Sequence, residues 1–120
     1  HKVKSMKENA KLDALGQLTV AANKAFFMAI KCYESGDDEN SVLFLAKKTE
    51  LEKMAMSLRG QILDEWCAEA EQILSQIREA NQAIQQSAAE LASSVQTVKN
   101  ISLALDFLQK VIELAAKFAP

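Results

Sequence analysis

The sequence is poor in the residues that interrupt helices. Its 120 residues include only three glycines and one proline, and the proline is the last residue. This shortage of turn residues excludes an architecture of many short strands joined by hairpins. It predicts a few long helices instead.

Residues that commonly carry catalysis are also scarce. The single histidine is His1, and no glycine-rich phosphate loop or nucleophile motif occurs. The two cysteines, Cys32 and Cys67, have apolar neighbours, which favours buried, reduced thiols. Because neither cysteine has an internal imidazole as its base, we expect no enzymatic activity.

Carboxylates are densest at Asp64, Glu65, Glu69 and Glu71, around Cys67. This group includes types of side chain that ligate metals, but the Glu-x-x-His pairs of di-iron helical bundles are absent. We interpret it as a solvated acidic surface and expect neither a metal nor a cofactor. A metal-binding bundle that uses carboxylates and cysteine stays open as an alternative.

Long apolar runs are missing as well. No stretch approaches the roughly 20 apolar residues of a membrane span, and no signal peptide is visible in these residues. The six lysines of residues 1–31 come without an arginine or aromatic cluster, which argues against nucleic acid. We expect a cytoplasmic protein, and a membrane-active or structural helical assembly stays open as an alternative.

The sequence does contain a heptad pattern from Gly60 to Pro120. Every seventh residue is apolar in one row, and a second row three residues later is apolar or small. This spacing is typical of helices that pack along a coiled-coil-like seam. The first row is Leu63, Ala70, Ile77, Ile84, Leu91, Val98, Leu105 and Ile112, and the second is Trp66, Ile73, Ala80, Ser87, Ser94, Ile101, Leu108 and Ala115.

The first half of the chain predicts two helices joined by a tight turn. We expect the first helix from about Ser5 to Ser35 and the second to end near Arg59. Gly36 suits the left-handed residue that ends a helix, and Asp37 suits the N-cap of the next one. The predicted buried face of the first helix is Leu12, Leu15, Thr19, Ala22, Phe26, Ala29 and Tyr33, widened by Leu18, Ala25, Ile30 and Cys32.

Beyond Gly60 the heptad phase favours long, continuous helix, with at most one interruption between Ala80 and Ser102. The chain is therefore expected to form one all-α domain over residues 1–120. Its predicted architecture is an antiparallel bundle of three to four helices with a long, heptad-patterned, coiled-coil-like C-terminal region. Packing of the lysine-rich residues 1–31 along the acidic residues 61–95 would bring opposite charges together and help to set the orientation, but we interpret the lysine-rich segment as an ordinary solvated start of a helix.

Two features indicate an interaction surface. Between Ala80 and Val98 the only charged residue is Glu90, so this stretch is expected to be covered by other helices of the bundle or by a partner. Phe26, Phe27 and Met28 must point in different directions, and exposed Phe and Met are typical of adaptable binding surfaces. The candidate surface is Ala80, Ile84, Ser87, Leu91, Ser94, Val98, Phe27 and Met56.

These observations predict a non-enzymatic protein–protein interaction module, such as an adaptor, small chaperone, regulator or inhibitor, that acts through a long amphipathic helical surface. A homodimer is expected if the C-terminal region is one straight helix. Such a helix would be about 85 Å long, and the first two helices would cover only about 72 Å of it. If the chain instead folds back between Ala80 and Ser102, the bundle covers its own seam.

Overall fold

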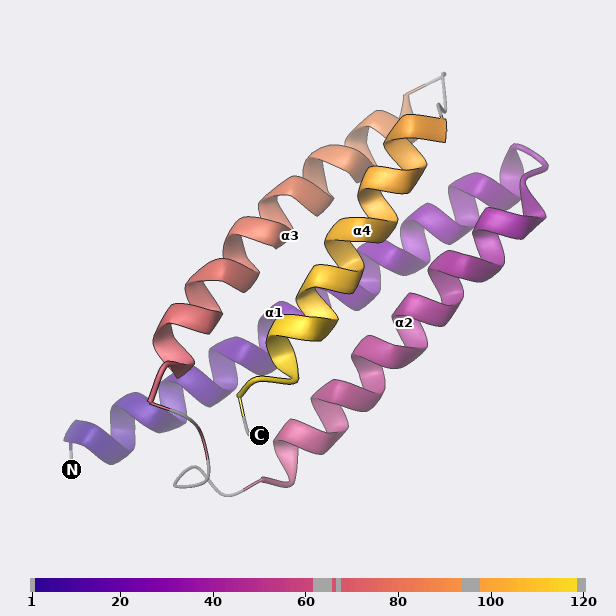
Figure 1. Cartoon of the computed structure of the whole chain (residues 1–120). Helices are drawn as coiled ribbons and strands as arrows, with labels where there is room; N and C mark the ends of the chain where they lie inside the picture. The colour runs from indigo at the N-terminus through magenta and orange to yellow at the C-terminus, as the bar shows by residue number, and fades with distance from the viewer. Residues whose placement is uncertain (1, 62–65, 67, 94–97, 119–120) are drawn as a thin grey trace.

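The structure is a four-helix bundle. This computed structural model describes residues 2–61, 66, 68–93 and 98–118, with side chains from Asn9 onward except that of Val98. Consecutive helices run in opposite directions, so α1 begins and α4 ends at the same end of the bundle (Figure 1). The all-α fold is therefore confirmed. The helices are α1 (Lys2–Glu34), α2 (Asp38–Arg59), α3 (Ala70–Ala92) and α4 (Val98–Ala115).

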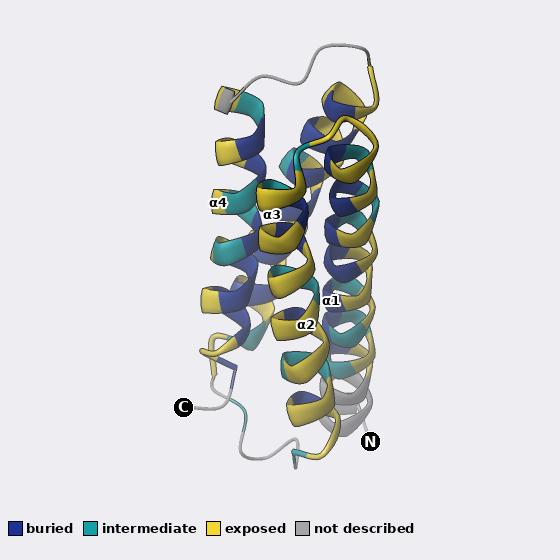
Figure 2. Cartoon of the chain, turned by 90° about the vertical axis from the view of Figure 1, so that its right-hand side faces the viewer, coloured by how far each residue is buried: buried dark blue, intermediate teal, exposed yellow. Residues whose placement is uncertain are grey.

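The bundle consists of two helical hairpins packed on each other. One hairpin is α1–α2 and the other is α3–α4; α1 also lies against α3, and α2 lies against α4. The buried sides of the helices face the middle of the bundle, as Figure 2 shows. The largest fully buried side chains include Leu18, Met28, Phe44, Leu51, Ile77, Ile84 and Leu108.

The turn between α1 and α2 forms as its residues predict. Gly36 has a φ of +83°, the left-handed conformation that costs glycine little. The Asp37 carboxylate accepts a hydrogen bond from the backbone N–H of Asn40 at 3.1 Å and caps α2. Ser41 then ties the two helices together, because its hydroxyl donates to the backbone carbonyl of Ala29 at 2.8 Å.

The expected continuous helix beyond Gly60 does not form. α2 ends at Arg59, and Gln61, Trp66 and residues 68–69 lie outside the helices. α3 ends at Ala92 and α4 begins at Val98, so the chain folds back within the predicted window. The heptad phase persists because α3 and α4 turn their apolar faces toward one shared core, and the bundle covers its own seam.

The two heptad rows nevertheless identify the core face of the C-terminal half. Their members in α3 and α4 are mostly buried, although Ala70 and Leu105 are only half-buried. Trp66 keeps its place in the pattern without being helical, because its ring lies 4.7 Å from that of Phe118 at one end of the core. The buried members are Ile73, Ile77, Ala80, Ile84, Ser87, Leu91, Ile101, Leu108, Ile112 and Ala115.

The buried face of α1 differs from the predicted one. Five residues assigned to the buried face are exposed: Leu12, Thr19, Phe26, Ile30 and Tyr33. The actual core face consists mainly of small side chains, which let α1 lie close to α2 and α3. Its members are Ala14, Leu18, Ala21, Ala22, Ala25, Met28, Ala29 and Cys32.

α1, which contains the lysine-rich start, lies against α3 of the later acidic segment. The ion pair between these helices does not involve the charges that predominate in each segment. Arg78, a cation of the mainly acidic α3 segment, pairs with Asp13, an acid of the lysine-rich α1. Asn81 of α3 is buried, and its side-chain amide donates to the carbonyl and the side-chain oxygen of Gln17, at 3.0 and 2.8 Å. These polar contacts fix how α1 and α3 are aligned along their length.

Candidate interaction surface

Four of the eight residues expected to form the interaction surface lie inside the bundle. Ala80, Ile84, Ser87 and Leu91 are buried against helices of the same chain. Ser94 and the side chain of Val98 lie outside the described residues. In the folded chain this part of α3 is therefore core, which was the other interpretation open for the stretch, and a partner has no access to it.

The outward side of α3 is polar. Gln82, Gln85 and Gln86 are exposed, so other helices of the bundle do not cover this side of the charge-poor stretch. None of the exposed large hydrophobic side chains in the described part of the chain belongs to α3. An exposed apolar contact surface therefore has to lie on other helices of the bundle.

The adjacent Phe and Met residues diverge as predicted. Met28 is fully buried, Phe27 is half-buried against the core, and Phe26 is 45% exposed. In α2, Met54 packs partly against the core while Met56 is 71% exposed. Met56 is thus accessible, and the exposed aromatic residue of this group is Phe26 rather than Phe27.

Cys32, the cysteine that the structure describes, is not an activated nucleophile. Cys32 is buried, and burial followed by the nearby Asp37 charge raises the pKa of its thiol from 9.0 to about 11. A thiol that stays protonated at neutral pH is a poor nucleophile. Cys67, Asp64 and Glu65 lie outside the described residues. Within the described ranges, no three His, Cys, Asp or Glu side chains come together as a metal site would require.

Over the residues that the structure describes, no helix combines the length and the hydrophobicity that a bilayer crossing demands.

Exposed apolar side chains concentrate on the α1–α2 hairpin. Of the ten large hydrophobic residues that are exposed in the described part of the chain, nine belong to α1 or α2 and one, Leu103, to α4. Seven of the nine form two stripes at helical spacing, one on each helix of the hairpin. We call them the outer α1–α2 face: Leu12, Phe26, Ile30 and Tyr33 from α1, with Val42, Leu45 and Met56 from α2.

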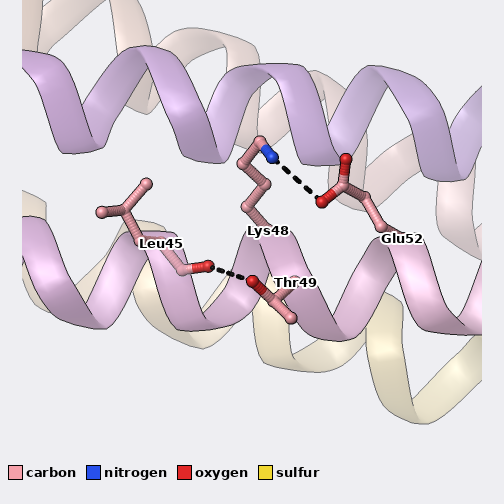
Figure 3. A network of polar contacts seen from close by, with 4 residues as sticks. All are labelled: Leu45, Lys48, Thr49 and Glu52. Carbon is pink, nitrogen blue, oxygen red and sulfur yellow. Dashed lines mark hydrogen bonds and ion pairs between the residues drawn. The ribbon is translucent and has the colours of Figure 1, made fainter.

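The two stripes flank the same interhelical groove. From α2, the Lys48 ammonium lies 5.5 Å from the centre of the Phe26 ring on α1 and pairs with Glu52 at 2.9 Å. Figure 3 shows both charged side chains reaching from α2 toward α1. Further along, a shallow hollow of about 260 Å³ opens between the helices, with Asn23 on one side and Met56 on the other. The face is thus apolar at its two ends and polar in its middle.

The sequence carried a signal for this face. The apolar positions of the first helix are too broad for one stripe, which is typical of a helix that is covered on two sides. Its alanine-rich side packs inside the bundle, and its larger Phe, Ile and Tyr side chains remain outside. The prediction that all of these apolar residues form one core face was therefore wrong, because α1 has two apolar sides.

Comparisons with protein-family models, with curated proteins and with solved structures find no match to this chain.

Proposed function

We propose that the protein is a non-enzymatic protein–protein interaction module that binds its partner through the outer α1–α2 face. The observation that carries the proposal is the concentration of exposed large hydrophobic residues on one hairpin. The α3–α4 hairpin has an ordinary polar exterior and serves as the support that holds α1 and α2 in place.

The composition of the face suits a protein partner. Protein interfaces are enriched in Tyr, Phe and Met relative to the rest of the surface, and the face offers Tyr33, Phe26 and Met56. Tyr33 is 68% exposed and Met56 is 71% exposed, so both lose much water contact when covered. Burying a side chain of this size stabilises a complex by roughly 1.5–3 kcal/mol before the costs of association.

A structural or membrane-active assembly would use the same face and is the second candidate. The charges beside the groove are of both signs, Lys48 and Arg59 against Glu52. A helix that lies on a membrane surface usually carries a strongly cationic polar side. Mixed charge therefore favours a protein partner over an anionic bilayer.

Site-specific photocrosslinking tests the proposal. A photoreactive residue at position 42 or 56 samples the outer α1–α2 face, and one at position 79 or 85 samples the exposed side of α3 as a control. In the cells that produce the protein, we expect discrete protein adducts from positions 42 and 56 and none from the α3 positions. Adducts of equal strength from both faces, or flotation of the purified protein with vesicles, would contradict the proposal.

A further inference from the structure

We infer that the outer α1–α2 face is covered by a second copy of this chain, related to the first by a two-fold axis that crosses both helices at their midpoints. The inference rests on the proposed function, because it names the partner of the same face. In this arrangement α1 lies antiparallel to α1 of the second copy, and α2 lies antiparallel to its own counterpart.

Two pairs of exposed residues, one pair on each helix, are placed symmetrically about a common level. On α2, Val42 and Met56 each lie seven residues from Thr49. On α1, Leu12 and Ile30 each lie nine residues from Ala21. A rotation about an axis near Thr49 and Ala21 therefore brings Val42 and Leu12 to the levels of Met56 and Ile30 of the second copy. The other three residues of the face, Leu45, Phe26 and Tyr33, have no apolar counterpart at their levels.

The two centres stand at the same height in the hairpin, as a common axis requires. Two contacts between the helices set this height: Ser41 Oγ donates to Ala29 O at 2.8 Å, and Lys11 Nζ donates to Arg59 O at 2.9 Å. Halfway between them, α1 near position 20 is level with α2 near position 50. These levels differ from Ala21 and Thr49 by one residue each, about 1.5 Å along a helix.

Charge complementarity selects this orientation. Lys48 and Glu52 lie close to the axis on α2, with Thr49 between them in sequence. With the axis between the levels of positions 49 and 50, the rotation places Lys48 of one copy about one residue along the helix from Glu52 of the second copy and about three residues from its own counterpart, and the reverse pair forms by symmetry. The other way to stack the faces, with both turns at the same end, would lay α2 against α1 of the second copy and would form neither pair.

The face is also large enough. The bundle measures 51 by 21 by 18 Å, so a long side offers an area on the order of 1,000 Å². A stable interface buries about 800 Å² on each partner. The contact is isologous, because the same residues serve both copies, and it closes at two chains without leaving a free surface for further growth.

Sedimentation of the purified chain with three charge variants tests the inference. The wild type is expected to move from 13.2 kDa toward twice this mass as its concentration rises. Lys48→Glu and Glu52→Lys should each weaken the dimer roughly tenfold, because each opposes like charges across the axis. An equimolar mixture of the two variants should regain wild-type affinity. Lys110→Glu makes the same charge change at an exposed position of α4, away from the outer α1–α2 face, and should have no effect.

Disulfide trapping then fixes the orientation. In a Cys67→Ser background, chains carrying Val42→Cys are mixed with chains carrying Met56→Cys and oxidised. The proposed axis predicts the mixed dimer, V42C joined to M56C, whereas faces stacked with both turns together would lay α2 against α1 of the second copy and would not form this disulfide. Absence of the mixed product from a dimeric sample would overturn the proposed axis. Thermal unfolding of every variant checks that the fold is retained.

The outcomes separate this inference from the proposed function. A chain that stays monomeric at every concentration, yet gives photoadducts with another protein from positions 42 and 56, overturns the second copy and keeps the interaction surface. A monomer without adducts at these positions overturns both. A dimer that Lys48→Glu and Glu52→Lys leave unchanged also contradicts the inferred arrangement.

Discussion

Truncation of Leu91 tests which face of the C-terminal half is core. Leu91 belongs to the first heptad row, is only 2% exposed and lies in the last turn of α3. Gln86, on the same helix, is exposed and belongs to neither row. The two residues thus give a matched pair for alanine substitution, one on the core face and one on the solvent face.

The expected effect of Leu91→Ala follows from the buried groups that are lost. Removing three carbon atoms costs about 0.8 kcal/mol each in transfer free energy, and the cavity that remains adds to this. Because Leu91 lies near the end of α3, its surroundings can partly collapse, so we expect about 2–3 kcal/mol, at the lower end of the usual range. Gln86→Ala should change the free energy of unfolding by less than about 0.5 kcal/mol.

Urea denaturation followed by circular dichroism measures both values. The midpoint for Leu91→Ala should fall clearly below the wild-type midpoint with little change in slope, and that for Gln86→Ala should not. Indistinguishable midpoints for the two variants would mean that the assigned register of α3 is wrong. If the chain is a dimer, all curves must be compared at one protein concentration.

Three further predictions concern α1 and its turn. Gly16→Ala should stabilise the chain by about 0.5–1 kcal/mol in the same assay, because Gly16 is an exposed residue inside α1 and an added Cβ would meet nothing within 4 Å; a loss of stability would contradict this. Asp37→Ala should cost about 1 kcal/mol, since it removes the N-cap of α2, and Asp37→Asn should retain most of the wild-type stability. The Cys32 thiol binds its proton more tightly folded (pKa about 11) than unfolded (9.0), so it lowers the free energy of unfolding as the pH rises from about 9 to 11. Cys32→Ala should remove this part of the pH dependence, and identical slopes in both proteins would refute it.

Local chemistry made the first half of the fold predictable. Gly36 and Asp37 specify a left-handed residue and an N-cap by their own conformational preferences, and the turn forms where they stand. The end of α2 beside Gly60 is also marked. Long-range packing decides the rest.

The start of α3 carries no comparable signal. Its N-cap residue, Glu69, makes no side-chain capping hydrogen bond, and the heptad row continues through this region because Trp66 packs on Phe118 from outside any helix. A periodic pattern reports which residues reach the core, and it does so whether or not the backbone between them is helical. This is why the buried positions and the window of the interruption were predicted correctly, whereas the helix expected directly after Gly60 begins only at Ala70.

The interaction surface was the least predictable part. Apolar size alone assigned Phe26 and Tyr33 to the core, but the core face of α1 is built from alanines that allow close helix packing. Which of two apolar stripes faces inward depends on the shape of the neighbouring helices, and one chain's sequence does not state that shape. Met56 was identified because helical geometry prevents it from sharing a core with Met54.

Hydroxyl-radical footprinting tests most directly whether the outer α1–α2 face is the contact surface. Met56 and Tyr33 are the most exposed reactive side chains of the face, and the fully buried Met28 provides an internal control. In dilute solution we expect rapid oxidation of Met56 and Tyr33 and little of Met28. At the concentration where the chain associates, oxidation of Met56 and Tyr33 should fall strongly while Met28 stays unchanged. Association that leaves both residues as reactive as in dilute solution would contradict the account.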